Sequence, residues 1–209
     1  MLKKLVSVAM VVSLLLFSPL AVIDTNFSTP RLATHLIYNS SGNASGVMIA
    51  PGRMLTAKHV AVIHSDANPL YVRGKPVKRV IATSKEADLA LLEVDLDCPC
   101  VPVGNLPDDD SDVLVVGFPV QDQAQMQVLT EGKVSGYNPM QNVLLTSAPA
   151  APGNSGGGLF QRQYGKWKLV GILSSVSLIP IFGMFPNLIS HMSYSVDTLS
   201  IKGFLRGAV

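Results

Sequence analysis

One serine in the sequence stands in a setting suited to nucleophilic chemistry. Ser155 lies within the stretch 152–158, read PGNSGGG, and is surrounded by residues with little or no side chain. The stretch is either a flexible turn or a place where the backbone must come close to something. A serine hydroxyl is a weak nucleophile unless a base takes its proton and a third group orients that base. The interpretation therefore depends on partners elsewhere in the chain.

A base and an orienting acid can both be found upstream of this serine. Of the four histidines, His59 has the most suggestive context, because it follows an expected strand and a Pro-Gly turn. His35 opens the first expected strand, and His64 and His191 lie in loop-like segments. Asp88 stands at the head of the apolar run 89–92. A carboxylate at the rim of a buried strand needs a polar partner, and an imidazole would supply one.

Chain order separates two kinds of serine hydrolase. Gly153-x-Ser155-x-Gly157 also fits the nucleophile elbow of α/β-hydrolases, in which the serine precedes the acid and the histidine follows. After Ser155, however, the only available pair runs His191 and then Asp197, which is the reverse order. The order His59, Asp88, Ser155 is that of chymotrypsin-like enzymes.

The rest of the chain predicts an all-β architecture to position these residues. Short runs rich in Val, Ile and Leu are separated by Gly, Pro, Asn and Asp clusters, which favours strands over helices. These runs are 46–50, 77–82, 89–94, 113–118, 143–146, 169–174 and 193–196. The polar segment 106–112 divides the chain into two strand-rich lobes. Residues 197–205 suggest a short final helix capped by Asp197 or Thr198.

Four stretches together resemble one family. They are 45–49 with 55–60, 88–92, 113–119 with 131–136, and 153–157 with 169–173. In type and order they are similar to chymotrypsin-fold (trypsin-like) serine proteases, closest to bacterial HtrA-type protease domains. The resemblance covers most of residues 35–205. It implies two six-stranded antiparallel β-barrels, at about 30–105 and 112–200, in a protease domain over 25–209. No PDZ domain is expected.

The resemblance also implies roles for the site residues. Ser155 would attack the scissile carbonyl, His59 would take and return its proton, and Asp88 would hold the imidazole. The amides of Gly153 and Ser155 would form the oxyanion hole. No cofactor or metal is implied. The substrates would be polypeptides.

A primary specificity pocket is expected around Pro149, Ser174, Ser175 and Val176. Ser174 matches a family serine whose backbone pairs with substrate and whose hydroxyl supports the triad carboxylate. Pro149 stands where trypsin-like members carry an acid, so cleavage after Lys or Arg is not expected. Val176 stands where relatives often have glycine, which predicts a narrowed pocket for small or medium aliphatic side chains. His191 is either a loop histidine or a residue that selects acidic substrates.

The N-terminus predicts export. Lys3 and Lys4 precede the apolar run 5–23, which indicates a secretory signal or an uncleaved membrane anchor over 1–24. Either would place the rest of the chain outside the cytoplasm, secreted, periplasmic or anchored to the outer face of a membrane. Without Lys3, Lys4 and Asp24 the chain carries 14 basic and 13 acidic residues, which gives no electrostatic footprint for nucleic acid.

Three further features leave alternatives open. Cys98 and Cys100 are too close for an ordinary disulfide and too few for a zinc site, so they are two thiols or a strained local bridge. The apolar segment 177–189, broken by two prolines and a glycine, is expected to be a loop that covers the core or contacts substrate or membrane. Lys58 is expected to face solvent; pointing inward, it would lower the basicity of the imidazole.

Three functions remain in competition. The leading one is an exported serine endopeptidase. The alternatives are a catalytically silent protease-fold protein that binds peptides or associates with a membrane, and acyl transfer or esterase action on the same fold.

Overall fold

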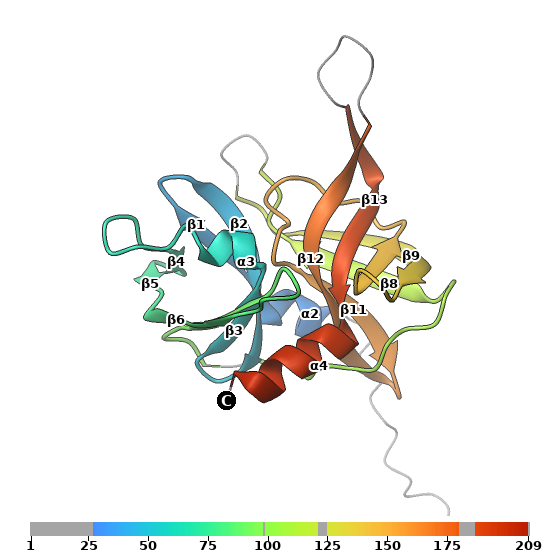
Figure 1. Ribbon diagram of the computed structural model, residues 1–209, viewed down its shortest axis with the longest axis horizontal. Helices are drawn as coiled ribbons and strands as arrows, with labels where there is room; N and C mark the ends of the chain where they lie inside the picture. The colour runs from blue at the N-terminus through green and yellow to red at the C-terminus, as the bar shows by residue number, and fades with distance from the viewer. Residues whose placement is uncertain (1–26, 98, 121–124, 180–186, 209) are drawn as a thin grey trace, which may run out of the picture.

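The computed structural model describes residues 27–97, 99–120, 125–179 and 187–208, and within strands it leaves the side chains of residues 176–179 and 187–191 undescribed. The segment 1–24, expected to be a signal or anchor, lies outside these ranges. Within the described residues, no helix has both the length and the apolar character needed to cross a membrane. Figure 1 shows two strand-rich lobes side by side, with a C-terminal helix across their base.

The first lobe is a curled antiparallel sheet of seven strands preceded by a short helix. The helix is α2 (Ser28–Ala33), and the strands run β5-β4-β1-β2-β3-β7-β6 across the sheet. Their bounds are β1 (Thr34–Asn39), β2 (Gly42–Ala50), β3 (Arg53–Thr56), β4 (Tyr71–Val72), β5 (Lys75–Pro76), β6 (Arg79–Thr83) and β7 (Ala90–Glu93). A single turn of helix, α3 (Lys58–Ala61), follows β3.

The second lobe is a closed antiparallel barrel of six strands in the order β10-β13-β12-β11-β8-β9. Its strands are β8 (Asp112–Gly117), β9 (Val128–Asn138), β10 (Val143–Thr146), β11 (Gly158–Gln163), β12 (Lys166–Ile179) and β13 (Asn187–Asp197). The final helix is α4 (Thr198–Gly207). Asp197 caps it, since its carboxylate accepts a hydrogen bond of 2.7 Å from the Ser200 amide.

The two-lobed all-β prediction is confirmed, with one difference in detail. The second lobe is the expected six-stranded barrel, whereas the first is a seven-stranded sheet whose end strands β5 and β6 are not paired with each other in the described residues. The strands at this end are short, because β4 and β5 are each two residues long, and β5 pairs with β4 over two residue pairs.

An apolar core joins the lobes. One cluster of buried side chains includes Val47 and Leu55 of the first lobe together with Phe160, Leu169 and Ile201 of the second lobe and α4. Each such side chain contributes about 1.5–3 kcal/mol relative to exposure. Separate clusters fill the interior of each lobe. The shared cluster holds β2 and β3 against β11 and β12, the elements that flank the candidate site.

The segment 177–189 departs from the expectation of a loop. Residues 177–179 end β12, residues 187–189 begin β13, and these two ends pair antiparallel, so that Ser177 faces Ile189 across the ladder. Figure 1 shows this hairpin rising beyond the barrel. Residues 180–186 lie outside the described ranges. The prolines and the glycine that argued against a strand are all among them.

The second unsettled segment contains the cysteines. Cys100 is disulfide-bonded, and Cys98 lies outside the described residues.

Candidate active site

His59 is fixed by its own backbone as well as by its ring. It lies in α3, where its amide donates a hydrogen bond of 3.0 Å to Asp88 Oδ1. Its ring Nδ1 lies 2.8 Å from Asp88 Oδ2. The carboxylate therefore holds the imidazole at two points. With Nδ1 engaged as a donor, Nε2 is left to accept a proton.

Asp88 is held by a compact turn before β7. The hydroxyl of Ser84 accepts hydrogen bonds from the amides of Glu86 and Ala87, at 3.3 and 3.1 Å. From the second lobe, the Ser174 hydroxyl donates a hydrogen bond of 2.6 Å to Asp88 Oδ2. The bond expected between this serine and the carboxylate is therefore present, and it crosses from one lobe to the other.

The hydrogen bonds set the protonation states of the pair. Burial by itself would raise the pKa of Asp88, but the bonds from the His59 ring, the Ser174 hydroxyl and the His59 amide lower it to about 2. The hydrogen bond to Asp88 raises the pKa of His59, burial opposes this, and the carboxylate charge adds to the rise. Asp88 is thus anionic at neutral pH and favours the imidazolium form of its partner.

Ser155 is positioned by backbone contacts from both lobes. Its carbonyl accepts a hydrogen bond of 2.8 Å from the Ser45 amide of β2, and the next amide, that of Gly156, donates one of 2.7 Å to Leu173 O of β12. Within the described residues, the amides of Gly153 and Ser155 donate no hydrogen bond, whereas that of the intervening Asn154 donates to Ala151 O at 3.0 Å. Two amides, that of Ser155 itself and that of Gly153, are therefore free as donors within the described residues.

The glycines on either side of Ser155 are required by geometry. Gly153 and Gly156 have φ of +94° and +82°, a region that L side chains rarely adopt. A Cβ at Gly153 would lie 2.6 Å from Phe118 O, and a Cβ at Gly156 would collide with Thr56 Oγ1 and the Ser45 carbonyl. The flexible-turn interpretation of PGNSGGG is therefore wrong, because this turn is packed closely on its neighbours.

His59 and Ser155 line the same cavity of about 290 Å³. No hydrogen bond joins their side chains in the part of the chain that the structure describes. Such bonds are often long in unliganded enzymes and tighten when substrate binds. The structure thus places the imidazole, held by its carboxylate, and the hydroxyl at one cavity.

Ser45 contributes to the site in a way that the sequence did not reveal. Its fully buried hydroxyl donates a hydrogen bond of 2.9 Å to Gly153 O and accepts one of 2.9 Å from the Phe118 amide. The Thr56 hydroxyl in turn donates one of 2.7 Å to Ser45 O. The sequence signal that could have revealed this role is the position of a polar residue at the start of the apolar part of β2.

Lys58 does not face solvent, which corrects the expectation. Its ammonium is partly buried and donates a hydrogen bond of 2.8 Å to Ser84 O, in the turn that carries Asp88. The cation therefore joins α3 to the Asp88 turn. The pKa of His59 is raised by its hydrogen bond to Asp88, so the lower basicity considered for an inward-pointing Lys58 is not found.

The expected specificity residues lie in β12 and in the segment that follows β10. Ser174 and Ser175 are in β12, half-buried and exposed respectively. The backbone of Val176 pairs with Ser193, but its side chain is not described. Pro149 is half-buried, and its carbonyl accepts a hydrogen bond of 2.6 Å from Thr130.

The other three histidines are in separate settings. His64 accepts a hydrogen bond of 3.1 Å from the Leu70 amide at Nδ1. Burial and the charge of Arg73 lower the pKa of His35, in β1, to about 4. His191 is in β13, with its side chain outside the description.

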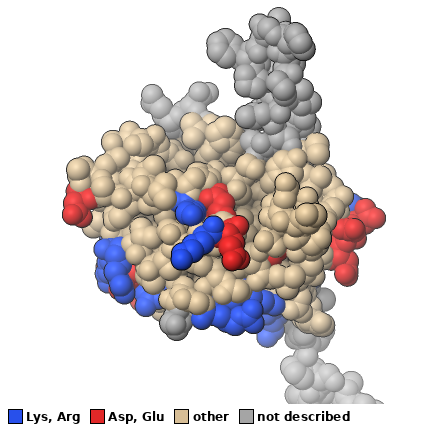
Figure 2. Space-filling view, in the orientation of Figure 1, with Lys and Arg blue, Asp and Glu red and all other residues tan. Residues whose placement is uncertain are grey.

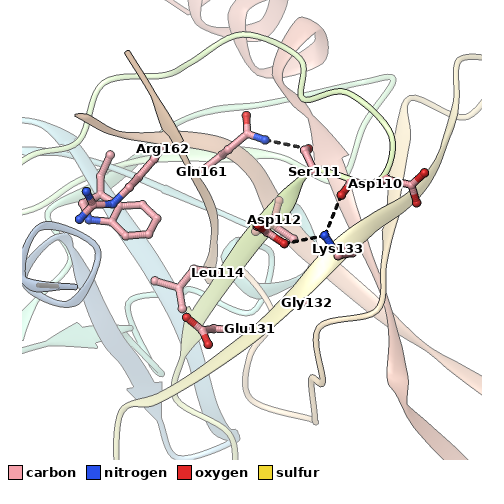
Figure 3. A pocket seen from close by; sticks show the side chains of 11 residues that line it. Asp110, Ser111, Asp112, Leu114, Glu131, Gly132, Lys133, Gln161 and Arg162 are labelled. Atoms are coloured by element: carbon pink, nitrogen blue, oxygen red, sulfur yellow. Dashed lines mark hydrogen bonds and ion pairs between the residues drawn. The ribbon is translucent and has the colours of Figure 1, made fainter. Parts of the chain in front are cut away.

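A larger cavity, of about 870 Å³, lies elsewhere, between β8, β9 and β11 of the barrel (Figure 3). Two of its charged side chains pair, since Lys133 Nζ lies 2.8 Å from Asp112 Oδ1, and the same ammonium donates a hydrogen bond of 3.0 Å to the Asp110 carbonyl. It contains none of the triad candidates. Figure 2 shows the other charges on the viewed face in small separate groups of both signs. In the described ranges, no cluster of three or more His, Cys, Asp or Glu side chains could hold a metal ion.

Comparison with known proteins agrees with the fold. The model of the trypsin-like peptidase domain family matches residues 44–172, more than half of the chain. The chain belongs to this family and is a serine endopeptidase. No curated protein sequence matches it.

Solved structures of bacterial proteases share the fold. Rv3671c from M. tuberculosis H37Rv, an inactive Ser343Ala mutant, is 18% identical with a TM-score of 0.66, over 91% of this chain and 93% of that one. The serine endoprotease from Yersinia pestis is 23% identical with a TM-score of 0.67, over 88% and 66%. The HtrA-type protease AlgW, crystallised as the S227A variant with a tripeptide, is 22% identical with a TM-score of 0.68, over 87% and 61%. The chain therefore spans about two thirds of the length of the latter two proteins.

Proposed function

We propose that this chain is an exported serine endopeptidase that works through a His59-Asp88-Ser155 triad and an acyl-enzyme. The observation that carries the proposal is the doubly bonded His59–Asp88 pair, whose imidazole opens onto the same cavity as Ser155. The pairing leaves Nε2 as the proton acceptor. The same cavity gives a substrate carbonyl access to the hydroxyl.

The proposed reaction has two steps, acylation of Ser155 and hydrolysis of the acyl-enzyme. Ser155 Oγ bonds to the scissile carbonyl carbon and gives its proton to His59, and the imidazolium passes that proton to the departing amine as the C–N bond breaks. Water then attacks the ester carbon and loses a proton to His59, which returns it to Ser155 as the ester bond breaks. Asp88, anionic at neutral pH, stabilises the imidazolium in both steps.

The oxyanion that forms in each step needs hydrogen-bond donors. The free amides of Gly153 and Ser155 are suited to this role, because neither is used by a partner in the described residues. Donors of this kind typically contribute about 10²–10³-fold to turnover.

The substrates that we propose are polypeptides cleaved after small or medium aliphatic residues. Support for the substrate class comes from the AlgW structures, which were determined with a tripeptide and a decapeptide. Support for the side-chain preference comes from the sequence, which has no acid at Pro149 and carries Val176 in the expected wall. Export outside the cytoplasm, by a cleaved signal or by an anchor that attaches the protein to a membrane through residues 5–23, is proposed from the sequence of residues 1–24 alone.

Active-site labelling tests the proposal. A fluorophosphonate probe should label wild-type protein and fail to label Ser155→Ala, because only an activated serine reacts with it. Ser147→Ala, which removes an exposed serine of the barrel, is the matched control and should be labelled like wild type. Peptide hydrolysis should be lost in parallel with labelling. Folded wild-type protein that is not labelled would favour the silent peptide-binding alternative, and peptide hydrolysis undiminished in Ser155→Ala would refute the triad.

A further inference from the structure

We infer that Ile63, in the cavity beside His59 and Ser155, makes the enzyme select an apolar residue on the amine side of the scissile bond. The inference rests on the proposed function and adds a second specificity determinant to it. It concerns the leaving group, whereas the expected pocket around Ser174, Ser175 and Val176 concerns the acyl side.

The position of the cavity relative to the nucleophile indicates which side of the substrate it receives. Ser155 lies between two strands, with its carbonyl bonded to Ser45 of β2 and the following amide bonded to Leu173 of β12. The expected acyl-side wall is the continuation of β12 past Leu173. Apart from Ser155, every residue that lines the cavity belongs to the first lobe, on the β2 side. With the acyl part of the substrate along β12, the part that extends from Ser155 toward residues 41–44 and Ile63 of the first lobe is, in our inference, the part that leaves as the amine.

The chemistry of the lining favours an uncharged, apolar side chain. The floor is formed by four buried residues, Ile37, Ala44, Val60 and Leu70. Ile63 also lines the cavity, and 41% of its surface is exposed. The remaining lining residues are Ser41, Gly42, Asn43, His59 and Ser155, so no lining side chain carries a carboxylate, an ammonium or a guanidinium.

An apolar side chain placed here would cover Ile63 and the floor, whereas a charged one would lose water without gaining a partner. A single methylene in an apolar pocket changes discrimination by about 10-fold or more. The cavity should therefore select leucine over glycine, and both over aspartate, as the first residue of the leaving peptide.

Partitioning of the acyl-enzyme measures this pocket directly. The acyl donor is an acetylated tripeptide thiobenzyl ester ending in alanine, and the competing nucleophiles are leucinamide, glycinamide, aspartamide and argininamide. In aminolysis the amine nitrogen bonds to the acyl carbon, the ester bond to Ser155 Oγ breaks, and the amine proton passes through His59 to Ser155. Water attack on the same intermediate is the internal reference, so the ratio of amide product to acid product reports the leaving-group side alone.

Wild-type enzyme should give a ratio at least about 10-fold higher with leucinamide than with glycinamide, and the lowest ratio with aspartamide. Ile63→Asp should abolish the preference for leucinamide and raise the ratio for argininamide above it. Such a gain cannot arise from misfolding. Val62→Asp is the matched control, because it adds the same charge one residue away at a side chain that is 64% exposed and lies outside the cavity lining.

The outcomes separate this inference from the proposed function. Thioester hydrolysis with equal ratios for leucinamide and glycinamide would overturn the pocket and leave the triad standing. A switch to argininamide in Val62→Asp as large as that in Ile63→Asp would also overturn it, since the effect would then be long-range electrostatics. Absence of thioester hydrolysis and of probe labelling in folded protein would overturn both.

Discussion

The two lobes hold their parts of the candidate site by different means. The first lobe presents His59 and Asp88 through side-chain hydrogen bonds, on a four-residue helix and a short turn. The barrel presents Ser155 through backbone hydrogen bonds and two glycines of positive φ, packed where no Cβ would fit. The acid and base are therefore oriented by individual hydrogen bonds of the Asp88 side chain, which a single substitution can remove. The nucleophile is oriented by main-chain shape.

The lobes are connected at the site by a few polar contacts. Ser45 of β2 bonds to both Gly153 and Ser155, and Ser174 of β12 bonds to Asp88. Each lobe thus supplies one residue that holds the reactive group of the other. The comparison predicts that single substitutions will act on one half of the site and spare the other.

The largest effect is expected from Asp88→Asn. The substitution removes the negative charge that orients His59, so turnover should fall by about 10⁴-fold. The nucleophile turn should stay intact, because within the described residues Asp88 makes no hydrogen bond to it, and the Ser155 carbonyl is bonded to the Ser45 amide. Steady-state kinetics on a peptide substrate measures the loss. A decrease of less than 10-fold would show that the carboxylate is not part of the catalytic unit.

The converse substitution is Gly153→Ala. Its Cβ would meet Phe118 O and Val120 N, each at 2.6 Å, and its φ would be strained. Misplacing one oxyanion donor should lower kcat by about 10²–10³-fold. NMR titration should find the pKa of His59 still raised, because the His59–Asp88 pair lies on the other lobe. Loss of that raised pKa would show that the two halves are not independent.

A smaller effect is expected from Lys58→Met, which removes the ammonium that joins α3 to the Asp88 turn. Loss of a hydrogen bond with a charged partner should lower kcat by about 10-fold, with little change in KM. Lys85→Met is the control, because Lys85 is exposed in the same turn and the change in charge is the same. Equal losses in both variants would assign the effect to net charge instead of to the Lys58–Ser84 bond.

The smallest effect is the response to pH. Catalysis needs neutral His59, so kcat/KM should rise with pH through a midpoint above 6.5, since the hydrogen bond to Asp88 raises that pKa. The contribution of His59 to the stability of the fold depends on pH in the opposite direction to activity. It is complete below pH 6.5 and is lost as pH rises through the raised pKa of folded His59.

For Asp88 the stabilisation is present above its ordinary pKa of 3.8 and is lost as pH falls toward about 2. Ser174→Ala removes one of the bonds that lower this pKa, so its acid unfolding should begin at higher pH than that of wild type. Thermal melting between pH 2 and 8 measures both the loss of stability at acid pH through Asp88 and the loss at higher pH through His59. Identical acid limbs in wild type and Ser174→Ala would show that this bond does not stabilise the fold.

The sequence by itself determined the chemistry and its order along the chain. A hydroxyl among glycines, an imidazole after a strand and a carboxylate at the head of another are local patterns, and so are the strand runs and the Asp197 cap. Composition and spacing report such features because they depend on neighbours in the chain.

Only the tertiary structure decided how these groups are held. Segments distant in sequence decide that Lys58 bonds to Ser84 and that Ser45 supports Gly153. They also decide that, in the described residues, the first lobe is a seven-stranded sheet whose two end strands do not pair with each other. Lysine and serine are compatible with solvent as well as with a buried partner, so their types alone could not choose. The packing of one lobe on the other made that choice, because burial leaves a polar group no acceptable state except a hydrogen-bonded one.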